Sequence, residues 1–271
     1  MAKAFQDCII LFGDSLTECQ DVRQALFERM SQAYARKLDV FNRGFGGFSS
    51  TTALPLFDKI FARKVKTGTA VRLVTLWFGT NDSVNFPNPR ATHPNHFKEN
   101  MEYFLYNLTS SNSIYEISET PIHILLITPP PPYDPQIPSA AKWIRNKKRS
   151  LEFANVLRNL AKDWKIKEKG HENKSGWTVE LLDLWKALEE EVGEKEQGLE
   201  PFFHDGCHMT TEGYQILWNE YRKIIKGPWK GHGLDWEVDE DLPKRVPFFK
   251  DTEFQRPESV VELMALPKCR R

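Results

Sequence analysis

Three residues of this chain, Ser15, Asp205 and His208, are of the types that together make a hydroxyl nucleophilic. A serine hydroxyl is too weakly acidic to attack an ester unaided, so a neighbouring imidazole must accept its proton. An acidic side chain is then needed to hold that imidazole in the correct tautomer. Asp205 lies three residues before His208, so a turn can fold its carboxylate back onto the ring. The sequence therefore predicts a nucleophile at Ser15, a base at His208 and an orienting acid at Asp205.

Attack on an ester carbonyl also creates an oxyanion, which requires hydrogen-bond donors aimed at it. Three groups of this chain could supply them: the backbone N–H of Ser15, the backbone N–H of Gly47 and the side-chain amide of Asn81. Because Gly47 has no side chain, its N–H can approach a reacting oxygen closely. We therefore expect Ser15, Gly47 and Asn81 to form an oxyanion hole.

Each of these motifs also has a simpler structural interpretation. Asp205 or Thr210 could cap the start of a helix. The glycines at 44–47 could form only a strand-to-helix turn, and Asn81 could form an Asx-turn. The catalytic interpretation is favoured because the motifs occur together in one chain, with the serine just past the end of a predicted strand.

Three other kinds of site are less consistent with the sequence. The segment 44–49 approaches the dinucleotide fingerprint G-x-G-x-x-G but lacks its final glycine. Asp14, Asp82, Asp205 and His208 could hold the metal of a phosphoesterase, although paired His–Asp ligand motifs are missing. The G-x-S-x-G elbow of α/β-hydrolases does not occur, because the segment 13–17 ends in threonine.

Strands and helices are expected to alternate along the chain. Apolar runs with β-branched residues predict strands at 8–12, 40–42, 71–78, 122–128 and 179–184. Helical spacing predicts helices at 21–37, 51–66, 93–109, 140–169 and 211–225. Such alternation predicts an α/β fold with a parallel sheet and helices on both faces. The four motifs should then meet at the carboxyl ends of the strands, where open α/β sheets bind their ligands.

Composition limits the class of protein. The 271 residues include 37 Lys and Arg and 37 Asp and Glu, so the net charge of +0 offers no argument for a nucleic-acid partner. We expect no stable membrane insertion, because no apolar stretch approaches the length of a membrane span. The four cysteines lack CxxC spacing and no secretory signal is evident, so we expect a cytoplasmic protein.

The amino-acid composition changes after Lys226. We expect one domain over 1–226 and a C-terminal extension over 227–271, rich in proline and acidic residues and containing Trp229 and Trp236. These aromatics argue against a freely disordered tail. The extension is predicted to pack on the domain or on a partner subunit, which would make the protein a homodimer.

The four motifs resemble, in order, the signature of the SGNH (GDSL) hydrolases. The matching stretches are Gly13-Asp14-Ser15, NRGFGGFSS with Gly47, Gly79-Thr80-Asn81-Asp82 and Asp205-Gly206-Cys207-His208. Within that family they are most similar to the isoamyl acetate-hydrolysing esterases. The resemblance implies a flavodoxin-like three-layer α/β/α sandwich with a five-stranded parallel sheet. It also implies ester hydrolysis through an acyl-serine, with no cofactor and no metal.

The same resemblance implies a small-molecule substrate, a short-chain carboxylic ester such as the acetate of a medium-length alcohol. Three other esters would suit the same triad: a lysophospholipid, an acyl thioester or an acetylated sugar. A non-catalytic binding protein on this fold is the alternative from a different class.

Overall fold

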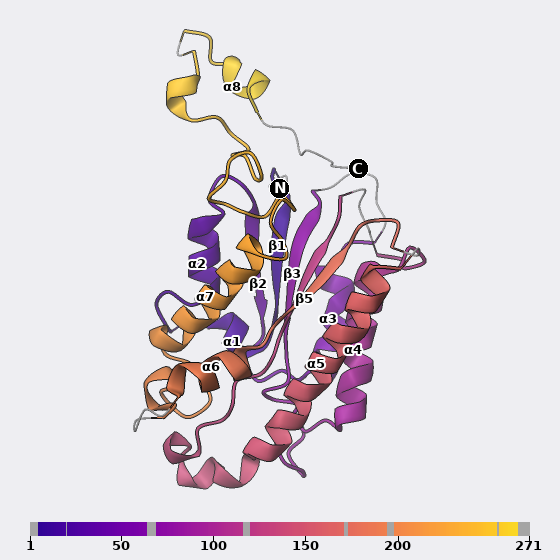
Figure 1. Cartoon of the computed structure of the whole chain (residues 1–271), viewed down its shortest axis with the longest axis vertical. Coiled ribbons are helices and arrows are strands. Elements are labelled where there is room, and N and C mark those ends of the chain that lie inside the picture. Colours follow the sequence, from indigo (N-terminus) through magenta and orange to yellow (C-terminus); the bar gives the residue numbers. More distant parts are fainter. Residues whose placement is uncertain are drawn as a thin grey trace.

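The structure is a computed structural model, and it describes residues 5–19, 21–63, 69–115, 120–170, 173–193, 198–253 and 255–264. Its centre is a five-stranded sheet in which every pairing is parallel, in the order β2-β1-β3-β4-β5 (Figure 1). The strands are β1 (Cys8–Gly13), β2 (Asp39–Gly44), β3 (Val71–Trp77), β4 (His123–Ile127) and β5 (Thr178–Leu182). The predicted parallel sheet is confirmed, with strand bounds within two residues of those expected.

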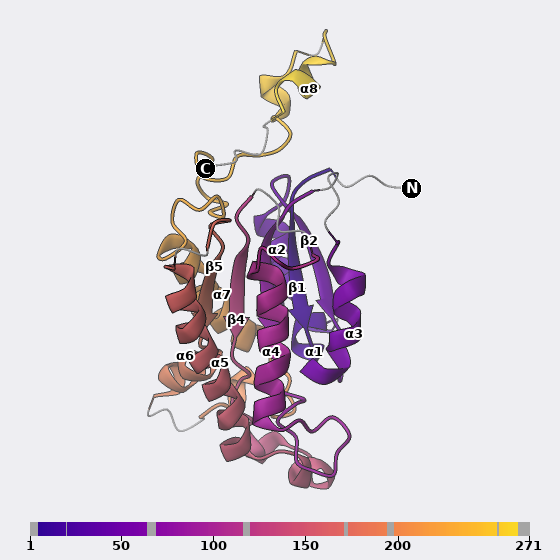
Figure 2. The same cartoon turned by 90° about the vertical axis from the view of Figure 1, so that its right-hand side faces the viewer.

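Helices cover both faces of the sheet (Figures 1 and 2). On one face lie α2 (Leu26–Ala33), α6 (Leu184–Val192) and α7 (Thr211–Lys226); on the other lie α3 (Ser50–Ile60), α4 (Pro94–Thr109) and α5 (Lys147–Glu168). Alternate residues of β1 serve the two layers, because successive side chains of a strand point to opposite faces. Ile9 and Leu11 pack in the cluster with α2 and α7, whereas Ile10 and Phe12 pack in the cluster with α3, α4 and α5. The three-layer α/β/α sandwich is therefore confirmed.

Several helices differ from the predicted ranges. The helix expected at 140–169 is interrupted, because the 3-10 helix η2 (Ser139–Ile144) ends before Arg145 and Asn146 caps the new helix α5 by accepting the N–H of Arg149 at 3.1 Å. The helix expected at 21–37 is shorter, and the one expected at 51–66 ends at Ile60, with 64–66 outside the described residues. Helix α6 was not predicted; Asp183 caps its start directly after β5.

Short elements complete the described chain. They are α1 (Ser15–Glu18), η1 (Asp134–Gln136), η3 (Glu200–Phe202), η4 (Phe249–Asp251) and α8 (Ser259–Glu262). Two of them matter for the site: α1 begins at Ser15, immediately after β1, and η3 precedes the loop that carries Asp205 and His208.

The predicted motifs lie at the carboxyl-terminal edge of the sheet. Gly13, the last residue of β1, pairs with Gly44 at the end of β2 and with Trp77 at the end of β3. The loops that follow these three strands therefore leave the sheet side by side. Helix α7 begins three residues after His208, so the loop before it reaches the same edge.

The segment after α7 packs on the rest of the molecule. Trp229, Leu234 and Leu242 are buried in the same hydrophobic cluster as α2 and α7. Residues 254 and 265–271 of the predicted extension lie outside the described residues, so its bounds and any partner stay predictions. Among the described helices, none is both long and apolar enough to cross a bilayer.

Candidate active site

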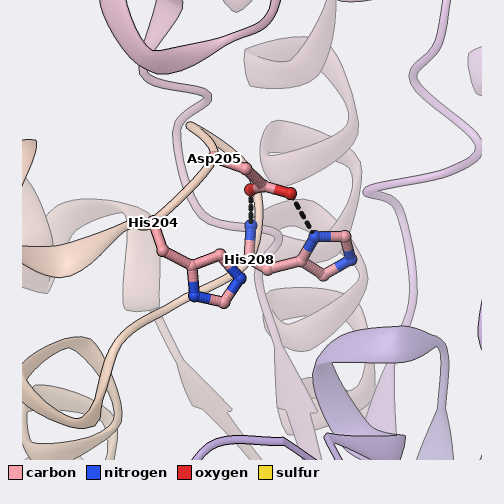
Figure 3. A group of neighbouring side chains, drawn as sticks. All are labelled: His204, Asp205 and His208. Carbon is pink, nitrogen blue, oxygen red and sulfur yellow. Dashed lines mark hydrogen bonds and ion pairs between the residues drawn. The ribbon is translucent and has the colours of Figure 1, made fainter.

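Ser15 and His208, 193 residues apart in the chain, lie within hydrogen-bond distance of each other. The Ser15 hydroxyl oxygen is 3.0 Å from Nε2 of His208. On the other side of the ring, Nδ1 of His208 is 2.7 Å from a carboxylate oxygen of Asp205 (Figure 3). The structure therefore joins a hydroxyl, an imidazole and a carboxylate in one hydrogen-bonded chain, in the order that nucleophilic activation of serine requires.

A tight turn aims the carboxylate of Asp205 at the imidazole. Its second oxygen accepts the backbone N–H groups of Cys207 at 2.9 Å and His208 at 2.7 Å, so the same side chain also stabilises the turn. Gly206 makes this turn possible, since its φ of +76° is in the left-handed region and a Cβ there would collide with the carbonyl of Tyr133. The helix α7 is capped separately by Thr210. Thr210 is therefore the helix cap, whereas Asp205 stabilises the turn and orients His208.

The Asp205–His208 contact changes the pKa of both groups. Burial opposes ionisation of Asp205, but the hydrogen bonds from the ring and backbone of His208 and from Cys207 outweigh it, so the pKa of Asp205 is lowered. The hydrogen bond to Asp205 raises the pKa of His208 above its ordinary value, against a smaller opposing effect of burial. Asp205 is therefore a stable anion, and it favours the protonated ring that would form when His208 accepts a proton.

The three predicted oxyanion donors lie on the loops that follow β1, β2 and β3, which leave the sheet side by side. Among the described residues, neither the backbone N–H of Ser15 nor that of Gly47 has a hydrogen-bond partner. Gly47 has a φ of +79°, and a Cβ built on it would meet nothing within 4 Å, so the backbone is open on that side. The amide of Asn81 donates one hydrogen bond to the carbonyl of Phe48 at 3.0 Å, which ties the two loops together. The second amide hydrogen of Asn81 is left for a ligand.

Two buried carboxyl groups brace the loops around these donors. Asp14 caps α1 by accepting the N–H of Leu16 at 2.9 Å, and burial raises the pKa of Asp14 to about 7. Asp82 accepts hydrogen bonds from Ser50 and from the N–H of Gly79, and burial raises its pKa to about 6 against the effect of those bonds. Both residues position neighbouring backbone.

A small pocket adjoins His208 and was not predicted from the sequence. It contains about 230 Å³ of empty space, part of it open to solvent. Its lining comes from the loop after β3, the prolines after β4, the start of α5 and the turn before His208: Thr80, Ser83, Pro130, Pro131, Pro132, Arg145, Ser150 and Cys207. Arg145 was missed because a continuous helix was predicted across it, although Asn146 is a typical helix cap.

A second arginine, Arg90, was also missed. Its guanidinium donates to the side-chain oxygen of Asn81 at 3.2 Å. Arg90 lies in a proline-rich segment that follows no helical or strand pattern, so the sequence carried little signal for its position.

One group of side chains could in principle hold a metal ion. Candidate ligand atoms of His204, Asp205 and His208 lie within 4.8 Å of one another (Figure 3). A metal there would compete with the hydrogen bond between Asp205 and His208. Asp14 and Asp82, which a phosphoesterase site would need, belong to no such group among the described residues.

A comparison with known proteins finds a family that matches most of the chain. The family described as GDSL-like Lipase/Acylhydrolase matches residues 9–220. A GDSL esterase/lipase of Arabidopsis thaliana is 26% identical over 260 residues, covering 93% of this chain and 72% of that protein. The isoamyl acetate-hydrolyzing esterase 1 homolog of Mus musculus is 26% identical over 263 residues, covering 92% of this chain and 90% of that protein.

Solved structures share the fold. A lipase/acylhydrolase from Enterococcus faecalis aligns with a TM-score of 0.54 at 22% identity, over 82% of this chain and 97% of that one. An acetylxylan esterase from Geobacillus stearothermophilus aligns with a TM-score of 0.55 at 15% identity, over 83% and 96%. At these identities the similarity shows a shared fold, that is, the same arrangement of the sheet and helices.

Proposed function

Since the chain belongs to the GDSL-like lipase/acylhydrolase family and is a carboxylic ester hydrolase, we propose that it acts through a catalytic triad of Ser15, His208 and Asp205. The observation that carries this proposal is the continuous chain of contacts, 3.0 Å from Ser15 to His208 and 2.7 Å from His208 to Asp205. His208 accepts the proton of Ser15 as the hydroxyl oxygen attacks the ester carbonyl. Asp205 holds the ring and stabilises its positive charge.

The oxyanion of the tetrahedral intermediate is held by the N–H of Ser15, the N–H of Gly47 and the amide of Asn81. His208 then gives its proton to the leaving alcohol, and the acyl group stays on Ser15 as an ester. A water molecule that loses a proton to His208 attacks this acyl-serine and releases the carboxylic acid. Each donor is fixed before the substrate arrives, which lowers the cost of stabilising the developing charge.

We further propose that the substrates are short-chain carboxylic esters, with acetate esters such as isoamyl acetate as the leading class. The mouse relative and the acetylxylan esterase are both named for acetate esters, which supports this class.

The sharpest test is a panel of 4-nitrophenyl esters of rising acyl length, run on the parent and on Ser15→Ala. We expect kcat/KM to be highest for acetate to butyrate and to fall with longer chains, and the variant to be inactive throughout. A maximum at long chains would replace the acetate proposal with a lysophospholipase or thioesterase. Hydrolysis by Ser15→Ala at the parental rate would contradict the triad.

We also propose that the protein is cytoplasmic and forms a homodimer. The aromatic side chains Phe248 and Phe249 in the extension are 40% and 55% exposed, which supports a contact with a second copy. Sedimentation equilibrium of the full chain tests the dimer, and a mass of one subunit would contradict it.

A further inference from the structure

Arg90 and Arg145 lie beside the candidate active site, and neither has a carboxylate partner within the described ranges of the chain. Both are half-buried. Arg158, also half-buried, shows a paired arrangement: it holds both oxygens of Asp183, at 2.7 and 2.9 Å. A guanidinium stays charged at all ordinary pH values, so one without a carboxylate partner is open to pairing with an anion. The two arginines at the site therefore carry uncompensated positive charge.

Neutral oxygens hold the two guanidinium groups in place. Arg145 follows the end of η2 and donates to the backbone carbonyl of Thr80 at 2.8 Å. Arg90 donates to the side-chain oxygens of Asn81 at 3.2 Å and Asn88 at 3.3 Å. These bonds fix the positions of the side chains without neutralising them. Since arginine has five N–H donors, each retains donors for a ligand.

The pocket beside His208 also contains an unpaired hydroxyl. Thr80 is only 6% exposed, and its hydroxyl oxygen has no hydrogen-bond partner in the described part of the chain. Thr80 and Arg145 line this pocket together, with Cys207 at its wall next to His208. Buried polar groups are almost always hydrogen-bonded, so an unpaired one in a pocket indicates a place for a polar ligand atom.

Nearby acidic groups compensate this charge poorly. Asp14 is the carboxyl group that interacts electrostatically with Arg145, but burial raises the pKa of Asp14 to about 7, so it is only partly ionised near neutral pH. Asp82 accepts hydrogen bonds from Ser50 and Gly79, and Asp205 is hydrogen-bonded to His208, so neither pairs with the two arginines. The chain as a whole has a net charge of +0, so the positive charge at this pocket does not reflect an excess of basic residues in the protein.

We propose that Arg145, assisted by Arg90 and the hydroxyl of Thr80, forms a subsite for an anionic oxygen group of the ester substrate. Within the short-chain esters proposed above, the preferred ones then carry a carboxylate or phosphate near the scissile bond, on either the acyl or the alcohol half, and a neutral ester such as isoamyl acetate is a poorer substrate. The planar guanidinium fork matches two oxygens of such a group. This inference rests on the proposed esterase function and names its substrate class.

Two matched pairs of esters test the inference, with the released acid measured by pH-stat titration. For the acyl half, ethyl hydrogen succinate is compared with ethyl pentanoate; for the alcohol half, 4-acetoxybutanoate is compared with pentyl acetate. We expect the parent to favour the anionic member of one pair by about tenfold or more in kcat/KM, as a hydrogen bond to a charged group contributes on that scale. The pair that responds identifies the half that carries the charge. The preference should shrink at high salt, which screens charges.

Variants then assign the preference to the arginines. We expect the anionic-to-neutral ratio to fall about tenfold in Arg145→Gln, and to be partly kept in Arg145→Lys, which retains the charge but not the fork. Arg90→Gln should lower the ratio less. Arg63→Gln is the matched control, because Arg63 is exposed and pairs with Asp58, and its ratio should equal that of the parent.

The outcomes separate this inference from the proposed function. A parent that hydrolyses both neutral esters through Ser15 but shows no preference for an anionic ester overturns the anion subsite alone. A preference that is insensitive to salt and unchanged in Arg145→Gln also overturns it. A parent that hydrolyses none of the four esters nor 4-nitrophenyl acetate overturns the proposed function, and the subsite with it.

Discussion

At the amino-terminal edge of the sheet, charged side chains have carboxylate or ammonium partners, whereas the carboxyl-terminal edge leaves charges and donors open. Lys37 pairs with Asp239 at 2.7 Å, and Arg72 lies 3.5 Å from Asp7. Asp241 accepts three backbone N–H groups of residues 233–235. The chain after α7 thus closes the first edge by packing and pairing.

The opposite edge contains the groups that a ligand would complete. The N–H groups of Ser15 and Gly47 and the hydroxyl of Thr80 have no hydrogen-bond partner among the described residues, and the guanidinium of Arg145 has no carboxylate partner there. Unpaired polar atoms also occur near the amino-terminal edge, at Nε of Arg72 and Nε1 of Trp229. What distinguishes the carboxyl-terminal edge is that its open groups lie on the loops around Ser15 and His208, which indicates that this edge serves chemistry.

The largest expected effect is at the carboxyl-terminal edge. Replacement of Ser15 by Ala removes the nucleophile and should lower kcat/KM for 4-nitrophenyl acetate by roughly 10⁴- to 10⁶-fold, as in other serine hydrolases. His208→Ala should lose a similar amount, and the two losses should not add, because both residues act in one step. The thermal midpoint should stay close to that of the parent. Unfolding of Ser15→Ala at a much lower temperature would contradict the assignment of Ser15 to catalysis and not to stability.

At the amino-terminal edge, Trp229→Ala should show the opposite pattern. Trp229, in the segment after α7, is fully buried in the hydrophobic cluster that contains α2 and α7, so its removal should cost about 3–5 kcal/mol of unfolding free energy. Urea denaturation measures this cost. The kcat of the folded variant should remain near that of the parent. A loss of kcat without a loss of stability would contradict the comparison.

Asn81→Ala should give an intermediate loss of activity. Removal of one oxyanion donor typically lowers kcat by about 100- to 1,000-fold, with a smaller change in KM. Asn81→Asp is a second variant: it keeps the volume and the acceptor for Arg90, but it loses the donor to the carbonyl of Phe48 and places a carboxylate near the oxyanion. Steady-state kinetics with acetate esters checks both. A parental kcat in both variants would remove Asn81 from the oxyanion hole.

The smallest expected effect is a shift in the pH profile. His208 must be neutral to accept the proton of Ser15, and its hydrogen bond to Asp205 raises its pKa above the ordinary value of 6.5. Activity should therefore be lost on the acid side with a midpoint above 6.5, and it should be fully present at higher pH. The profile of kcat/KM measures this midpoint in the free enzyme. A midpoint below 6.5 would show that Asp205 does not stabilise the protonated ring.

The sequence was sufficient for the parallel sheet and for the meeting of the four motifs at one edge. Both follow from local signals: buried apolar runs predict strands, and the carboxyl ends of parallel strands share an edge. The contact of Ser15 with His208 could be expected from the chemistry of the two side chains. Its distance of 3.0 Å could not, because the turn at Gly206 sets it.

The surroundings of the site were less predictable. Arg145 reaches Thr80 only because a helix that looked continuous restarts at Asn146, and a single cap residue was too weak a signal to set that boundary. Arg90 is placed by a hydrogen bond to Asn81, nine residues earlier in an irregular segment, and no periodicity encodes such a contact. Burial of Trp229 likewise depends on the tertiary fold.

The identity of the nucleophile can be measured directly by labelling with an alkyl fluorophosphonate, which reacts with activated serines, followed by peptide mapping. We predict one phosphonyl adduct per chain, on the peptide containing Ser15, and no adduct in His208→Ala. An adduct on another serine, or labelling that persists in Ser15→Ala, would contradict it.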